Sequence, residues 1–118
     1  MTRKPTGTYD RFDVVAVPFP FTDEKKAKKR PALVLSASGS FNSIIGHSVM
    51  AMITSARNSL WPMDVEIRDL AAAGLPAPSL VRMKVFTLDH RLIDRTLGRL
   101  SENDSRLVAI SLHKLFET

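Results

Sequence analysis

The residues best suited to chemistry are cations and hydroxyls, which gather in three short segments, KKRPALVLS, MITSA and PSLVRMK. Arginine and lysine neutralise phosphates, and the fork of an arginine can bind two phosphate oxygens at once. Hydroxyl groups beside such cations can hold a phosphodiester in one orientation. The candidate site residues are Lys28, Lys29, Arg30, Thr54, Ser55, Ser79, Arg82 and Lys84. We therefore predict that a phosphodiester binds where these segments converge.

This set of residues favours cleavage of RNA, which carries its own nucleophile in the 2′-hydroxyl. A protein then has to hold the in-line geometry, stabilise the dianionic phosphorane and help the 5′-oxygen leave. Arg30 is suited to the second task, because Pro31 biases its backbone to an extended form and so presents the guanidinium from a rigid position. The competing interpretation is that the basic run 25–30 is only a solvated surface loop.

Other familiar chemistries lack their residues in this sequence. The chain has no cysteine, which excludes disulfides, thiol nucleophiles and cysteine zinc sites. It has no phosphate-binding glycine loop, no H-E-x-x-H and no G-x-S-x-G. His47, His90 and His113 are far apart in sequence, so we expect no metal site and no cofactor. His47 could point into a groove and His90 could help bind phosphate, but a strand-end role explains His47 at least as well and a structural role is favoured for His90.

Composition and charge indicate one small domain with a polyanionic partner. The 118 residues suffice for one core, so residues 1–118 are treated as a single domain with a loose arm at 1–11. The net charge of +5 and the pI of about 10.0 favour RNA, DNA or an acidic protein as partner. The polar N-terminus and the absence of a long apolar run predict a cytoplasmic protein that does not contact the membrane.

Short apolar runs punctuated by proline and glycine predict a mainly β fold. Strands are expected at 13–19, 31–36, 47–54, 64–67, 80–87 and 92–97. Asp69 and Gly74 should cap a helical turn at 70–73, and Ser101 should cap a C-terminal helix at 102–116. The result is a small closed or half-open β-barrel with a C-terminal helix. Its predicted core is Val15, Val17, Phe19, Leu33, Leu35, Met50 and Met52.

At these segments the sequence resembles the MazF/PemK family of bacterial toxins, the endoribonuclease halves of type II toxin–antitoxin pairs. The matching pieces are DVVAVPFPFTD, KRPALVLS, MITSA, WPMDV, AGLPAPSLVRMKVFTLD and LGRLS, in the family's order. They span about residues 12–101. The resemblance implies an SH3-like barrel of the MazF/PemK (CcdB-like) type, usually a homodimer. It also implies a metal-independent, sequence-selective ribonuclease that leaves 2′,3′-cyclic phosphate and 5′-hydroxyl ends.

The same resemblance implies roles for residues and partners. Arg30 corresponds to the family's catalytic arginine and Thr54 to its strand-end threonine. Lys28, Lys29, Ser55, Arg82 and Lys84 are then expected to bind the substrate. The expected partners are single-stranded RNA, an antitoxin with an acidic inhibitory segment and, with that antitoxin, operator DNA.

One departure from the family pattern keeps other functions open. Some relatives carry a carboxylate, assigned as general base, where this chain has Lys84. The general base is therefore unassigned, and a homologue without activity is one alternative. A non-catalytic RNA- or DNA-binding module on the same fold is another. The cleavage sequence cannot be read from these residues, and Phe21 and Trp61 are equally suited to the core or to stacking on bases.

Overall fold

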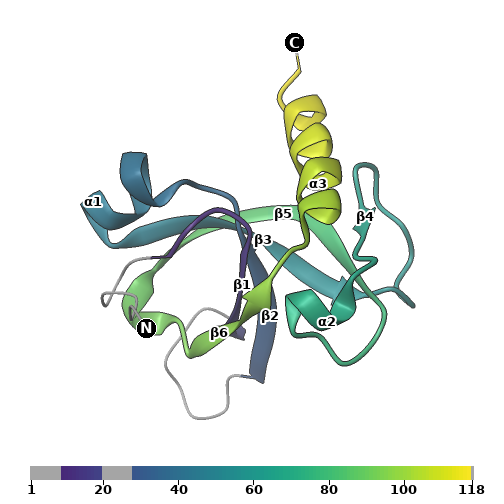
Figure 1. Ribbon diagram of the computed structural model, residues 1–118, viewed down its shortest axis with the longest axis horizontal. Coiled ribbons are helices and arrows are strands. Elements are labelled where there is room, and N and C mark those ends of the chain that lie inside the picture. The colour runs from purple at the N-terminus through teal and green to yellow at the C-terminus, as the bar shows by residue number, and fades with distance from the viewer. Residues whose placement is uncertain (1–8, 20–27, 118) are drawn as a thin grey trace.

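The computed structural model describes residues 9–19 and 28–117, and it contains one curled antiparallel sheet (Figure 1). The six strands lie in the order β4-β5-β3-β2-β1-β6 and form a half-barrel. Their bounds are β1 (Asp13–Phe19), β2 (Lys28–Val34), β3 (His47–Ser55), β4 (Val65–Glu66), β5 (Ser79–Asp89) and β6 (Arg95–Arg99). The predicted β fold with a C-terminal helix is confirmed.

Three strand predictions missed at least one end of the strand by two residues or more, those for β2, β5 and β6. β2 begins at Lys28, so residues 28–30 belong to the strand instead of the loop before it. β5 continues to Asp89, and β6 begins only at Arg95. The reason for the late start of β6 is a helical turn at His90–Leu92, which the Asp89 carboxylate caps by accepting from the backbone N–H of Arg91.

Two of the three α-helices of the described residues begin at side-chain caps, α2 (Leu70–Ala73) at Asp69 and α3 (Glu102–Leu115) at Ser101. The third, α1 (Ser43–Ile45), continues a helical turn at Ser38–Asn42 that the sequence did not predict. Asp69 caps α2 by accepting from the N–H of Ala72, and Gly74 ends it in the left-handed conformation. In Figure 1, α2 lies at one end of the sheet and α3 projects away from it. No helix within the described ranges is long and apolar enough to span a membrane.

The core lies on both faces of the sheet, which corrects the predicted single inward set. Leu33 and Leu35 join Val14, Ile53 and Val81 in a cluster that also packs against α3. A second cluster occupies the other face and contains Val15, Val17, Ala32, Val34, Met50 and Leu88. The strands β1, β2 and β3 are therefore covered on both sides. Of the remaining predicted core residues, Met52 is buried and Phe19 is only partly buried.

The first described residues are held against the sheet. The Asp10 carboxylate accepts from the backbone N–H of Ser38, and Tyr9 lies edge-on to His90 at 4.8 Å between ring centroids. Residues 9–11 of the predicted arm thus pack onto the domain. Residues 1–8 and 20–27, the latter including Phe21 and the first lysines of the basic run, lie outside the described residues.

Candidate active site

One face of the sheet carries a pocket of about 200 Å³ where β1 and β3 end. It is lined by Phe19, Arg30, Met52, Ile53, Thr54, Trp61, Arg82 and Lys84. The structure therefore brings together Arg30, Thr54, Arg82 and Lys84, which come from β2, β3 and β5. These four residues were predicted from three separate segments of the sequence.

Strand register explains why these side chains meet. Arg30 pairs with Val17 of β1, and Met52 pairs with both Ala32 and Arg82. Side chains two residues apart share a face, so the second core cluster continues along the strands into this pocket. A bulge lies at the same place: Ala51 pairs with Val85 while Met52 pairs with Arg82. β-bulges redirect side chains at such rims, and this one lies where Arg82 and Lys84 enter the pocket.

Arg30 is presented as the sequence predicted. Its backbone lies within β2, immediately before Pro31, and its side chain is exposed. The guanidinium carbon lies 6.0 Å from the centroid of the Phe19 ring, so the aromatic ring flanks the charge. An exposed guanidinium on a strand can approach a phosphate with its full fork.

The Thr54 hydroxyl already accepts one hydrogen bond within the protein. Its Oγ1 accepts a hydrogen bond from Nδ2 of Asn58, so its own proton remains available to a phosphate oxygen. Ser55 and Ser79 do not line the pocket. Ser55 Oγ accepts from the N–H of Arg57 at 3.2 Å, and Ser79 Oγ donates to the carbonyl of Ala77. Alternation along β3 and a local turn direct these two hydroxyls elsewhere.

The Arg82 guanidinium is hydrogen-bonded to Asp64 and Ser59 of the protein itself. Its Nε donates to Oδ1 of Asp64 at 3.2 Å, and its Nη2 donates to Oδ2 of Asp64 at 2.8 Å and to the carbonyl of Ser59. Burial alone would raise the pKa of Asp64, but the hydrogen bonds from Arg82 and from the Trp61 backbone hold that pKa below its ordinary 3.8. Its carboxylate therefore stays ionised, and the Arg82 fork is engaged by the 58–64 loop.

The lysines of β2 lie outside this pocket. Lys28 and Lys29 are exposed, and Lys29 Nζ lies 3.8 Å from Oδ1 of Asp94. Surface ion pairs of this kind hold a side chain weakly. As substrate ligands, these two lysines remain a prediction.

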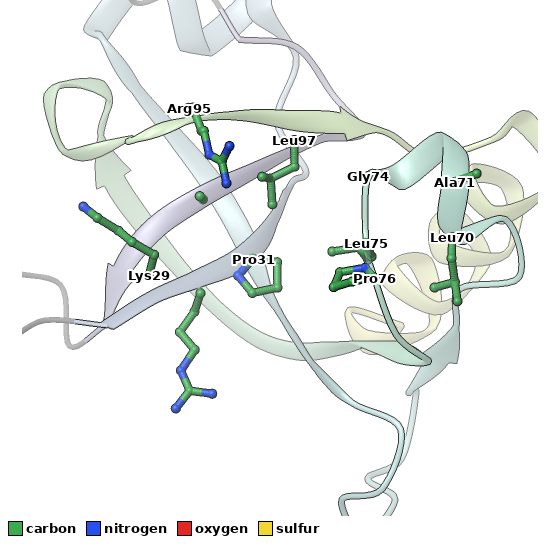
Figure 2. A pocket seen from close by; sticks show the side chains of 11 residues that line it. Lys29, Pro31, Leu70, Ala71, Gly74, Leu75, Pro76, Arg95 and Leu97 are labelled. Carbon is green, nitrogen blue, oxygen red and sulfur yellow. The ribbon is translucent and has the colours of Figure 1, made fainter.

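A larger groove of about 530 Å³ adjoins the pocket and shares Arg30 with it. Figure 2 shows Lys29 and Arg95 on the strand side of this groove, with Leu75 and Pro76 across from them. The groove therefore combines an apolar wall with basic side chains. An acidic and apolar chain segment would complement such a surface.

The histidines do not form a catalytic or metal cluster with these residues. His90 is buried, and its Nε2 lies 2.7 Å from Oγ of Ser48. His47 Nε2 lies 3.8 Å from the Asp89 carboxylate, and His113 is exposed on α3. Within residues 9–19 and 28–117, no group of three or more histidine or acidic side chains could hold a metal ion.

Sequence reasoning did not foresee the Asp64–Arg82 pair or the place of Trp61. Trp61 lies at the pocket and is 44% exposed, so it is a rim residue. One signal was present: Asp64 follows Trp61 by three residues, and its Oδ2 accepts from the N–H of Trp61 at 2.8 Å. A short polar side chain that bonds a nearby backbone N–H is a common turn device.

Comparisons with known proteins show which family and which folds the chain is similar to. Residues 10–116 match the family described as PemK-like, MazF-like toxin of type II toxin–antitoxin system. A search of curated proteins finds no match.

Similar folds occur among solved structures. A MazE–MazF structure from Deinococcus radiodurans is 21% identical with a TM-score of 0.71, over 94% of this chain and 97% of that chain. The Mycobacterium tuberculosis toxin MazF-mt6 is 21% identical with a TM-score of 0.69, over 88% and 95%. A mycobacterial endoribonuclease in complex with its cognate antitoxin is 14% identical with a TM-score of 0.67, over 91% of both chains.

Proposed function

Because the chain belongs to the PemK-like, MazF-like toxins of type II toxin–antitoxin systems, a family of RNA-cleaving toxins, we propose that it is a metal-independent endoribonuclease acting on single-stranded RNA. The observation that carries this proposal is the convergence of Arg30, Thr54 and Lys84 around one pocket. Three strands supply these groups, so their spacing is set by the sheet.

The proposed reaction uses the substrate's 2′-hydroxyl as nucleophile. Its oxygen loses its proton and attacks the adjacent phosphorus, the bond to the 5′-oxygen breaks, and that oxygen takes up a proton, so the products are a 2′,3′-cyclic phosphate and a 5′-hydroxyl. Arg30 stabilises the charge that develops on the phosphorane oxygens, because an arginine fork binds two such oxygens. Thr54 donates to a phosphate oxygen and fixes its orientation. We assign the general base to no residue.

Lys84 stands at the edge of the same pocket and is exposed. We assign it as a phosphate ligand, since an exposed ammonium on a flexible stem acts as a point charge. This role explains how the chain can bind RNA with a lysine where some relatives have a carboxylate.

The decisive experiment compares Arg30→Ala and Arg30→Lys with the wild-type protein in EDTA on a long single-stranded RNA. We expect discrete fragments with cyclic-phosphate and 5′-hydroxyl ends. In Arg30→Ala, kcat/KM should fall by roughly 1,000-fold while RNA affinity falls far less. The control is Arg106→Ala on α3, whose exposed arginine lies far from the pocket in sequence. Intact RNA whose affinity and salt slope fall together in Arg30→Ala would instead indicate a non-catalytic binding module.

A cognate antitoxin is the second proposed partner. We assign its acidic segment to the groove in Figure 2, because that groove holds Lys29 and Arg95 beside an apolar wall. Lys29 and Pro31 line the groove from one face of β2 and Arg30 points to the other, because side chains alternate along a strand, so an occupant of the groove would contact the strand that carries Arg30. Arg95→Glu should therefore weaken inhibition by antitoxin without removing cleavage. Unchanged inhibition would place the antitoxin on another surface.

The proposed assembly is a homodimer. α3 and the residue that ends it leave Ile110, Leu115 and Phe116 exposed, with Phe116 at 69%. A second copy is the simplest cover for such an apolar surface in a family of this kind. The mass of the protein in solution at micromolar concentration tests the proposal, and Phe116→Asp should shift that mass toward the value of a monomer.

Operator DNA binding by the toxin–antitoxin complex remains a prediction.

A further inference from the structure

We propose that Trp61 is a stacking platform for one unpaired base of the RNA, and that Asp64 and Arg82 hold this platform in place. Arg82 is then a positioning residue that acts through Trp61, and it does not bind phosphate itself. The inference rests on the proposed RNA substrate. In this arrangement Trp61 contacts a base next to the cleaved phosphate.

The first observation is the stack between Arg82 and Trp61. The guanidinium carbon of Arg82 lies 4.7 Å from the centroid of the Trp61 ring. Its edge donors reach the carboxylate of Asp64, and the paired side chains of Arg82 and Asp64 are only 10% and 4% exposed. A guanidinium fixed at its edge in this way presents its flat face to the ring.

The second observation is the bracing of the loop that carries Trp61. Asp64 Oδ2 accepts from the Trp61 N–H at 2.8 Å, and the carbonyl of Ser59 accepts from Arg82 Nη2. The N–H of Asp64 also donates to the Trp61 carbonyl at 3.3 Å. Met63, between them, adopts a left-handed φ of 71°. Such a conformation persists in a non-glycine residue only where its surroundings determine it, and here several hydrogen bonds do so.

The third observation is the position and exposure of the ring. Trp61 remains 44% exposed although it lies at the pocket lined by Arg30 and Thr54. Proteins that read single-stranded RNA stack its unpaired bases on aromatic rings beside cations that hold the backbone. Arg82 supports the ring, so a base on the ring's exposed surface would extend a stack that is already built. The platform and the proposed phosphate ligands then contact one stretch of RNA.

Trp61 is the only tryptophan of the chain, so its fluorescence reports on the platform directly. The probe is a pool of 2′-O-methyl RNA oligonucleotides, which lack the nucleophile and stay intact during titration. We expect quenching of the Trp61 emission that saturates together with binding measured by fluorescence anisotropy. Trp61→Ala should raise Kd by roughly 5- to 100-fold, and Trp61→Phe should restore most of the affinity. Once a cut site is known, one abasic position near it should remove the quenching.

Asp64→Asn and Arg82→Lys test the positioning role. Each should shift the Trp61 emission in the free protein and weaken binding, because each removes part of the brace. Neither should change the slope of log Kd against log salt concentration, since that slope counts phosphate contacts. A slope reduced by about one in Arg82→Ala, which removes the charge, would overturn the positioning role and make Arg82 a phosphate ligand. Circular dichroism confirms that each variant is folded, and Asp64→Asn gives the answer if Arg82 variants do not fold.

The outcomes separate this inference from the proposed function. RNA that is cleaved and bound without quenching, with equal affinity for Trp61→Ala, overturns the platform and leaves the nuclease intact. Quenching by RNA that is never cleaved supports the platform and removes the nuclease. If Trp61→Ala changes only the mass of the protein in solution and leaves RNA binding unchanged, Trp61 belongs to a protein interface. That result would overturn the platform.

Discussion

The carboxylate of Asp104 in α3 accepts a hydrogen bond of 2.9 Å from the backbone N–H of Asp69, which itself caps α2. Asp104 is fully buried and also accepts from the N–H of Arg68. The N–H of Asp104 in turn donates to Ser101, the cap of α3. These bonds join the start of α3 to the start of α2, so one buried side chain fixes the wall of the groove that α2 helps to form.

Replacing Asp104 should destabilise the fold. In Asp104→Asn, the amide NH2 group replaces one carboxylate oxygen and faces backbone N–H groups that need an acceptor. A buried donor left without a partner costs about 1–3 kcal/mol. Denaturant unfolding should show this loss in the free energy of unfolding. Glu102→Gln is the matched control, because Glu102 is exposed in the same turn of α3. Equal stability of the two variants would contradict the role of Asp104 as a joint between helices.

Thr54 should matter for turnover more than for stability. Thr54→Val keeps the shape but removes the donor to the phosphate, so kcat should fall by roughly 100-fold. Thr54→Ser should recover most of this rate. Thr87→Val, at an exposed position of β5, controls for the loss of a threonine hydroxyl from the sheet. A wild-type rate in Thr54→Val would remove the residue from the mechanism.

Lys84 should contribute binding, because its exposed side chain offers only a charge. Lys84→Met is expected to weaken RNA affinity and to lower the salt slope by about one, with kcat changed little. The alternative role, proton donation to the leaving 5′-oxygen, predicts a different result. In that case kcat would fall, and a substrate with a 5′-bridging sulfur would recover the rate, since sulfur leaves without a proton.

Features governed by local rules could be predicted from the sequence. Asp69 and Gly74 bracket α2 as expected, because an aspartate cap and a left-handed glycine are set by neighbouring backbone groups. Gly74 also meets a second requirement that only the fold reveals. A Cβ at Gly74 would lie 2.0 Å from the carbonyl oxygen of Leu97, so α2 can approach β6 only with glycine there.

Features that depend on long-range contacts escaped prediction. Alternation in β1 suggested one buried face, but the run of Val14, Val15 and Val17 is buried on both faces of the sheet. A continuous apolar run is equally typical of a strand covered on two sides, and only the tertiary contacts distinguish the two cases. Arg82 lines the pocket and its role as a substrate ligand remains a prediction, but its pairing with Asp64 was not foreseen. Its partner Asp64 lies in a turn 18 residues earlier, and sequence spacing does not show that the two meet.

Acid should release the loop that carries Trp61 before the rest of the protein unfolds. The pKa of Asp64 in the fold lies below its ordinary value of 3.8, despite burial, because Arg82 and the Trp61 backbone donate to its carboxylate. Because the pKa of Asp64 is lower in the fold than in the unfolded chain, its ionised carboxylate stabilises the 58–64 loop above pH 3.8. This stabilisation is lost as the pH falls through the lower pKa of the folded state. The emission of Trp61 should therefore shift toward that of an exposed tryptophan at a higher pH than the loss of the circular dichroism signal. Asp89→Asn, which removes another carboxylate with a lowered pKa, should keep this shift, whereas Asp64→Asn should show the exposed emission already at neutral pH. An emission that changes only with global unfolding in all three proteins would mean that Asp64 does not control the loop.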